Sequence, residues 1–253
     1  MNLVAPVLTI ARYTLLEALR NRLLWLLLLA ACGAIAASGL LHEVALTESR
    51  QLQAALLAAV LRLAAVFLVA TFVVTSMVRE ANDKGQELLL ALPLPRAVYL
   101  LGKLAGFGAL AVLPAALFGT LGLWFAPPGQ VALWSLSLLA ELWIVAAFSL
   151  LCMLTLNQVL PALAAAFAFY LLARTAGTLQ LLAHGPGQGE RLLAGAVDVL
   201  ALLLPRLDAY ARSDWLLYHG GTVAELAAIA IQSAIYVTLL TAAALFDLYR
   251  KEL

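Results

Sequence analysis

Six long apolar runs dominate this sequence and decide which solvent it can fold in. The runs are Leu23–Leu41, Leu52–Val78, Leu104–Phe125, Val131–Leu156, Val159–Ala183 and Val223–Phe246. A helix crosses the hydrocarbon of a bilayer with roughly 20 mainly apolar residues, and each run has about that length or more. Backbone groups in lipid must be hydrogen-bonded internally, and no run alternates as a barrel strand does. The sequence therefore predicts an all-α integral membrane protein with six transmembrane helices.

The composition supports a lipid environment and excludes several classes of soluble protein. Hydrophobic residues make up 65% of the 253 and charged residues 11%, whereas soluble domains carry about 25% charged residues. With a net charge of +1 and no long basic run, we expect no nucleic-acid partner. No Walker A or other glycine-rich phosphate loop occurs, so we expect no nucleotide or other cofactor on this chain. Cys32 and Cys152 lie inside apolar runs, so no disulfide framework is implied.

Lysine and arginine in the short connections set the orientation. Cytoplasmic loops carry an excess of these residues, and more than half of the fifteen fall on the side of the N-terminus. They are Arg12, Arg20, Arg22, Arg79, Lys84, Arg96, Lys103, Arg250 and Lys251. Both termini are therefore predicted to be cytoplasmic. Trp25 would then lie at the inner boundary and Trp124, Trp134 and Trp215 at the outer one, as an aromatic belt.

Two further segments flank the membrane without crossing it. Residues 4–22 carry apolar side chains on one face and charged ones away from it, which predicts an amphipathic interfacial helix. Residues 184–222 form an outer segment whose two apolar stretches, Arg191–Leu204 and Leu207–Tyr218, are too short to cross. Here we expect one or two helices that dip into the outer leaflet as a re-entrant segment. All these parts belong to a single transmembrane domain, 1–253.

One mixed-charge stretch, 79–103, separates the second and third runs. Within it, Gln86–Leu92 has the length of a short helix. Pro93 and Pro95 stop this helix, because proline removes a donor and constrains the residue before it. The polar residues around it are Arg79, Glu80, Asp83, Lys84, Glu87 and Arg96. A stiff helix with leucines for an apolar cleft and a polar rim predicts a docking site for a soluble partner; a solvated inside loop is the simpler alternative.

The order of residues in this stretch resembles that of the permease subunit of ABC exporters of the ABC-2 type. The family pattern is an acidic residue, a short charged stretch, a small apolar helix, then Pro, Arg and later Gly-Lys. The matching positions are Glu80, Asp83, Leu88–Leu90, Pro93, Arg96, Gly102 and Lys103. The resemblance covers nearly the whole chain and extends to the branch linked to multicopper-enzyme maturation, as in nitrous-oxide reductase assembly. Gly85-Gln86 departs from the Gly-Thr of many members, which alters the cap of the coupling helix.

The resemblance implies a transport subunit of the bacterial cytoplasmic (inner) membrane. Two copies of the chain form the pathway, and two cytoplasmic ATPase subunits hold ATP and Mg and drive export. Membrane lipid surrounds the dimer, and a periplasmic accessory protein is a further partner. In this interpretation no residue of the chain is catalytic. Coupling to the ATPase is assigned to Arg79, Glu80, Asp83, Lys84, Gly85, Glu87, Leu88, Pro93, Arg96 and Lys103.

Three ionisable residues lie inside the apolar runs, and such residues are rare and usually paired or functional. At 1.5 Å per residue, Arg62, Glu141 and Arg174 all lie about 23 Å from the cytoplasmic boundary. Equal depth allows Glu141 to pair with either arginine. We expect a charged layer that closes the outer end of the transport path or ties the helices there. The alternative is two arginines that reach the outer phosphates, with Glu141 at the interface.

Two weaker patterns leave their interpretation open. His42, His184 and His219 share the outer side of this topology, but their spacing is not that of a metal site, so we predict interfacial histidines and no metal. Gly102 and Gly106, four apart at the start of the third run, allow close helix packing. That packing fits a contact within the chain and a dimer contact equally well.

Two other functional classes remain as alternatives. An integral-membrane enzyme such as a lipid transferase would need clustered Asp or His residues at the cytoplasmic boundary. The one acidic cluster, Glu80, Asp83 and Glu87, alternates with Arg79 and Lys84, which is poor metal-site chemistry. A secondary transporter would show broken helices and polar residues near the midplane, and the first, third and sixth runs carry almost none.

Overall fold

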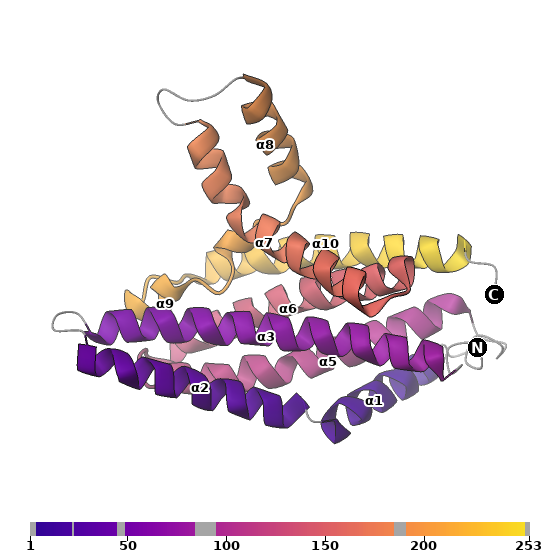
Figure 1. The fold of residues 1–253 in the computed structure, drawn as a ribbon, viewed down its shortest axis with the longest axis horizontal. Helices are drawn as coiled ribbons and strands as arrows, with labels where there is room; N and C mark the ends of the chain where they lie inside the picture. The colour runs from indigo at the N-terminus through magenta and orange to yellow at the C-terminus, as the bar shows by residue number, and fades with distance from the viewer. Residues whose placement is uncertain (1–3, 22, 45–48, 84–94, 185–190, 251–253) are drawn as a thin grey trace.

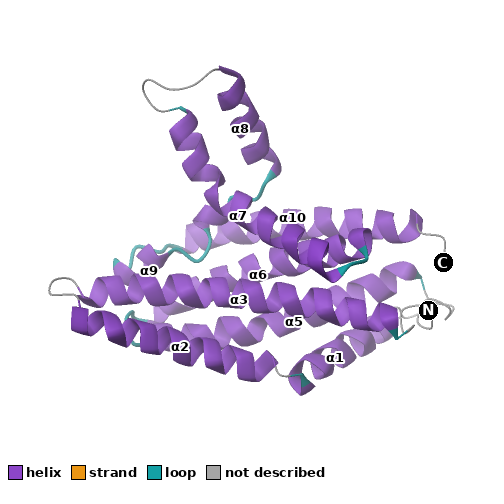
Figure 2. Cartoon of the chain, viewed as in Figure 1, coloured by secondary structure: helices purple, strands orange, loops and turns teal. Residues whose placement is uncertain are grey.

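The computed structural model describes residues 4–21, 23–44, 49–83, 95–184 and 191–250, and the regular structure in these ranges is entirely helical (Figure 2). The helices are α1 (Val4–Arg20), α2 (Leu23–Val44), α3 (Ser49–Asn82), α5 (Arg96–Gly122), α6 (Pro128–Leu156), α7 (Val159–Ala183), α8 (Arg191–Leu203), the 3-10 turn η1 (Leu207–Ala209), α9 (Ser213–Leu217) and α10 (Val223–Arg250). The prediction of an all-α chain is confirmed for the described residues.

Five of these helices, α3, α5, α6, α7 and α10, are long and apolar enough to cross a membrane. A sixth span results if α1 and α2, which meet at 55°, are taken together. The chain is therefore a multi-pass membrane protein, as the apolar runs predict. The first predicted run corresponds to α2, and 4–22 corresponds to α1.

The helices run along a long bundle, and the C-terminal part of α7 projects from its side as a hairpin with α8 (Figure 1). We call the end of the bundle where α1 begins and α10 ends the terminal end, and the opposite end, where α2 passes to α3, the far end. The end of α3 and the beginning of α5 also lie at the terminal end (Figure 1). Helix α6 is the most enclosed of the five candidate spans and α10 the least.

The charged stretch 79–103 contains less loop than expected. Helix α3 continues past the second apolar run to Asn82, and α5 begins at Arg96 rather than near Leu104. Polar residues continue both helices because they pair with one another there, as described below. The expected coupling helix, Gln86–Leu92, lies outside the described residues.

The two glycines at the start of α5 serve packing within the chain. A Cβ at Gly102 would lie 2.7 Å from Ile10 Cβ, and a Cβ at Gly106 would lie 2.6 Å from Thr14 Cβ. These distances are far inside van der Waals contact. Helix α1 therefore packs on α5 because these positions have no side chain, which settles the alternative left open above.

The tryptophans correct the expected aromatic belt. Trp25 and Trp124 are 74% and 80% exposed, as belt residues must be. Trp134 and Trp215 are 0% and 2% exposed and lie in the protein core. The Trp134 indole donates to Ala211 of the segment between α8 and α10, and Trp215 belongs to that segment, which packs against α3 and α6.

Short helices occupy the predicted outer segment, and they differ from the prediction in the second of its two stretches. Helix α8 matches the first predicted stretch almost residue for residue. The second stretch divides into η1 and α9, because Tyr210 is extended and Ala211 has a φ of 43°. This break turns backbone groups of residues 207–211 toward the bundle, where side chains bind them.

Candidate functional site

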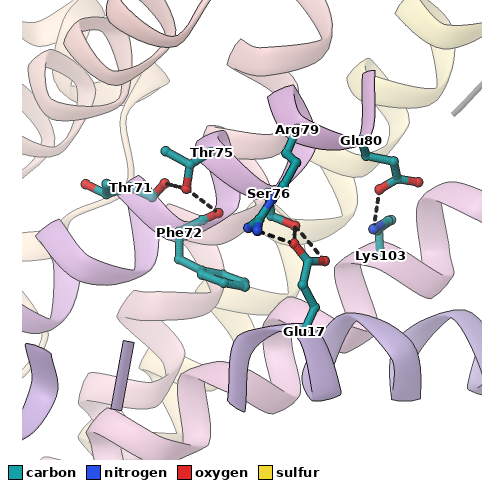
Figure 3. Close-up of polar contacts among 8 residues, drawn as sticks. All are labelled: Glu17, Thr71, Phe72, Thr75, Ser76, Arg79, Glu80 and Lys103. Atoms are coloured by element: carbon teal, nitrogen blue, oxygen red, sulfur yellow. Dashed lines mark hydrogen bonds and ion pairs between the residues drawn. The ribbon is translucent and has the colours of Figure 1, made fainter. Parts of the chain in front are cut away.

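The first candidate site is the base of the charged stretch at the terminal end (Figure 3). Glu80, near the end of α3, forms an ion pair with Lys103 of α5. The side chains are only 13% and 7% exposed, so the pair lies largely out of solvent. A buried pair is costly to break, because the remaining charge loses its partner in a poorly solvated place. The pair therefore fastens the end of α3 to the beginning of α5.

Helix α1 joins the same base through Glu17. Glu17 Oε1 lies 3.1 Å from Arg79 Nη2, and the Ser76 hydroxyl donates to the same carboxylate at 3.0 Å (Figure 3). The Arg79 side chain is 51% exposed, which makes this contact weaker than the buried pair. Together the two contacts hold α1 against the last turns of α3.

The other side of the stretch is attached to the last helix. Arg96 Nη1 donates to the backbone oxygen of Leu248 at 2.7 Å, and the guanidinium lies 5.8 Å from the centre of the Tyr249 ring. A cation at the C-terminal end of a helix is favourable, because unpaired carbonyl groups gather there. Arg96 thus links the beginning of α5 to the end of α10.

The structure assigns different places to the ten predicted coupling residues. Lys84, Gly85, Glu87, Leu88 and Pro93 lie outside the described residues. Glu80 and Lys103 face each other and hold the base, while Asp83 is exposed at its edge. Glu17 and Ser76, which complete the base, were missed by sequence reasoning. Their signal was a glutamate inside the amphipathic helix and a serine one turn before Arg79.

A cavity of about 460 Å³ lies among α1, α3 and α5 at this base. It is lined by Ile10, Tyr13, Thr14, Glu17, Ser76, Arg79, Glu80, Asp83 and Lys103. The walls mix both signs of charge, and most of those charges are already paired with each other. The cavity is therefore a gap beneath α1 rather than a site with one evident ligand.

The second candidate site is the charged layer inside the bundle. Glu141 of α6 is fully buried, and Arg174 Nη1 of α7 lies 3.5 Å from its Oε1. Of the two pairings that equal depth allows, the structure contains the one between Glu141 and Arg174. Arg62 of α3 is a further charged neighbour, but it donates to the backbone oxygen of Ala211 at 3.0 Å.

This layer holds the segment that follows α8. Arg174 Nη1 donates to the backbone oxygens of Leu207 and Tyr210, the latter at 2.8 Å. The Trp134 indole donates to the oxygen of Ala211 at 3.2 Å, and the Ala211 amide donates to the Ser137 hydroxyl at 2.9 Å. Three spanning helices, α3, α6 and α7, therefore bind main-chain groups of three residues, Leu207, Tyr210 and Ala211, within the segment 207–211.

Trp134 and Ser137 belong to this site and were missed as members of it. They lie seven and four residues before Glu141, which places all three on one face of α6. Their helical spacing from the intramembrane carboxylate of Glu141 could have identified both residues from the sequence. The groups that they bind could not be identified in this way, because they are main-chain atoms.

Tyr210 ties the same segment to α10. Its hydroxyl donates to the backbone oxygen of Ile229 at 3.2 Å and lies 3.0 Å from the Ser233 hydroxyl. Burial raises the pKa of Tyr210 to about 12, although the hydrogen bond with Ser233 acts in the opposite direction. The phenol therefore keeps its proton at neutral pH and remains a donor.

The histidines have separate surroundings. His184 Nε2 lies 3.4 Å from Asp198 Oδ2, which joins the end of α7 to α8. His219 is exposed, and the side chain of His42 lies outside the description. Within the described part of the chain, no group of three His, Cys, Asp or Glu residues has the geometry to hold a metal ion.

Comparison with known proteins adds no family to this description. No protein-family model matches the chain, and no curated protein matches it. Its function is therefore argued from the two sites themselves.

Proposed function

We propose that this chain is the membrane-spanning permease subunit of an ABC-2-type ABC exporter in a bacterial inner membrane. Two copies form the transport path, and a separate ATPase subunit binds each copy at the cytoplasmic stretch 79–103. In this proposal the terminal end faces the cytoplasm and the far end faces outward. ATP and Mg belong to the ATPase, because the sequence has no phosphate loop of its own.

The observation that carries the proposal is the bracing on both sides of residues 84–94. On one side, Glu80 and Glu17 tie the end of α3 to α5 and α1. On the other, Arg96 ties the beginning of α5 to α10. A plain solvated loop needs no such base. A loop that transmits mechanical work needs a rigid base, because its displacement must move the spanning helices rather than only bend the loop.

The charged layer supplies a second element that such a transporter needs. The segment 207–211 is bound to three of the spanning helices by Arg62, Arg174 and Trp134. In the proposed orientation this segment closes the outer side of the subunit. Transport then requires either that it moves or that the path runs beside it, between the two copies.

The test is purification of the tagged protein from its own membrane. We expect an ABC ATPase to accompany it in equal amount and to hydrolyse MgATP. Replacement of residues 84–94 by a Gly-Ser linker of equal length should release the ATPase. The matched control replaces residues 185–190 in the same way, which should leave the complex intact.

Two results would contradict the proposal. If no ATPase accompanies the protein, a membrane enzyme or a secondary transporter becomes the better interpretation. If the ATPase remains bound after replacement of 84–94, the coupling site lies elsewhere.

A further inference from the structure

The surroundings of Glu141 contain several buried polar atoms whose hydrogen-bonding capacity is unused. Among the described residues, neither Glu141 oxygen accepts a hydrogen bond, and Arg62 Nε and the Tyr170 hydroxyl also have no partner. Buried polar groups in native proteins nearly always have a partner, which is often an ordered water. Four such atoms in one protein interior therefore need a common explanation.

These atoms belong to one neighbourhood. Glu141 interacts with the charges of Arg174 and Arg62, and the Tyr170 hydroxyl lies close enough to the carboxylate for a weak hydrogen bond that falls short of the usual geometry. The Arg174–Glu141 distance of 3.5 Å is also longer than the 2.7–2.9 Å of a direct charge-assisted hydrogen bond. The ion pair is therefore loose, and the Glu141 carboxylate keeps unused capacity to accept hydrogen bonds.

The unused polar atoms around Glu141 determine which small molecule fits among them. They comprise two acceptors on Glu141 and two donors, Arg62 Nε–H and the Tyr170 hydroxyl. A water molecule donates two hydrogen bonds and accepts two, and an internal water needs two to four polar partners. An anion would oppose the carboxylate, and a cation would oppose the two guanidinium groups.

A surface cavity lies near this place. An open cavity of about 530 Å³ lies at the base of the α7–α8 hairpin. It is lined by Gly177, Thr178, Gln180, Leu181, His184, Arg206 and Asp208. Asp208 packs where Gly177 has no side chain, one of its oxygens is buried without a partner, and its charge acts on Arg174. Gly177 and Thr178 lie about one helical turn beyond Arg174.

We propose that ordered water fills a polar inlet from this cavity past Asp208 and Arg174 to Glu141, where it bridges the carboxylate, Tyr170 and Arg62. The inlet makes the charged layer a water-bridged joint between the spanning helices and the segment 207–211. Water-mediated hydrogen bonds are nearly as favourable as direct ones, so bridging water stabilises the buried charges even though Glu141 and Arg174 form only a loose direct ion pair. This site does not depend on the proposed transport function.

Radiolytic hydroxyl-radical footprinting of the purified protein tests the site, because bound water generates radicals where bulk solvent does not reach. Tyr170 and Tyr210 are 2% and 0% exposed, so bulk solvent reaches neither ring. The Tyr210 hydroxyl is hydrogen-bonded to protein groups, which makes Tyr210 the internal control. We expect oxidation of Tyr170 to be several-fold faster than that of Tyr210. Equal, slow oxidation of the two would overturn the proposal.

The route is tested by blocking the cavity from its exposed wall. Thr178→Trp fills the cavity and should slow oxidation of Tyr170 to the rate of Tyr210. Thr175→Trp is the matched control, since Thr175 is also exposed on α7, about one turn away, and is not among the residues that line the cavity. Fast oxidation of Tyr170 in both variants would show that water does not enter by this inlet.

Discussion

A methyl group added at Gly106 tests whether α1 is part of the bundle by close packing. The added Cβ would lie 2.6 Å from Thr14 Cβ and 2.9 Å from the backbone oxygen of Ala11. Carbon atoms rest about 3.5–4.0 Å apart, so α1 must move away by about 1 Å. The contacted atoms are backbone or next to it and cannot turn aside. Overpacking of this kind costs about 1–3 kcal/mol.

Gly108→Ala is the matched control in the same helix. A Cβ at Gly108 would first meet Trp143 Nε1 at 3.4 Å, which is an ordinary contact. Both substitutions gain the same helix propensity, about 1 kcal/mol, so their difference isolates the clash. We expect Gly106→Ala to be less stable than Gly108→Ala by about 1–3 kcal/mol in reversible unfolding in mixed detergent micelles. Equal stability would refute close packing of α1 on α5.

The ion pairs and hydrogen bonds give further expected outcomes. Lys103→Met leaves Glu80 buried without its cation and should lower the free energy of unfolding by about 3–5 kcal/mol in the same assay. Adding Glu80→Gln should recover most of this loss. If it recovers none, the two side chains do not form a stabilising ion pair. Trp134→Phe removes the donor to Ala211 and should cost about 0.5–1.5 kcal/mol. Arg174→Met frees two backbone oxygens, so deuterium exchange of residues 207–212 should rise; unchanged exchange would show that this arginine does not hold the segment.

Hydropathy predicted the spanning helices because lipid imposes one requirement on every one of them. A backbone in hydrocarbon must satisfy its own hydrogen bonds, so long apolar runs become helices whatever they pack against. The ends escaped prediction for the same reason. Residues 79–82 of α3 are mainly polar, and the first two turns of α5 are bounded by Arg96 and Lys103. Contacts such as Glu80 with Lys103 accompany the helices there, where apolar length gives no guidance.

The charged layer was half predictable. Arg62, Glu141 and Arg174 were recognisable as ionisable residues at one depth, which allowed Glu141 to pair with either arginine; the structure contains the pair with Arg174. The role of the layer in holding the segment 207–211 did not follow. Backbone oxygens carry no side-chain identity, and the left-handed conformation at Ala211 occurs at a residue type that gives no warning of it.

Helix α3 connects the two sites and gives the proposed coupling a physical route. It carries Arg62, bound to Ala211, and Arg79 and Glu80, bound to α1 and α5. From Arg62 to Arg79 the helix spans about 26 Å at 1.5 Å per residue, and no proline or glycine interrupts it. Kinks need such a residue or an inserted group, so α3 transmits displacement as a rod. A push on Glu80 therefore reaches the contact between Arg62 and Ala211 without an intervening hinge.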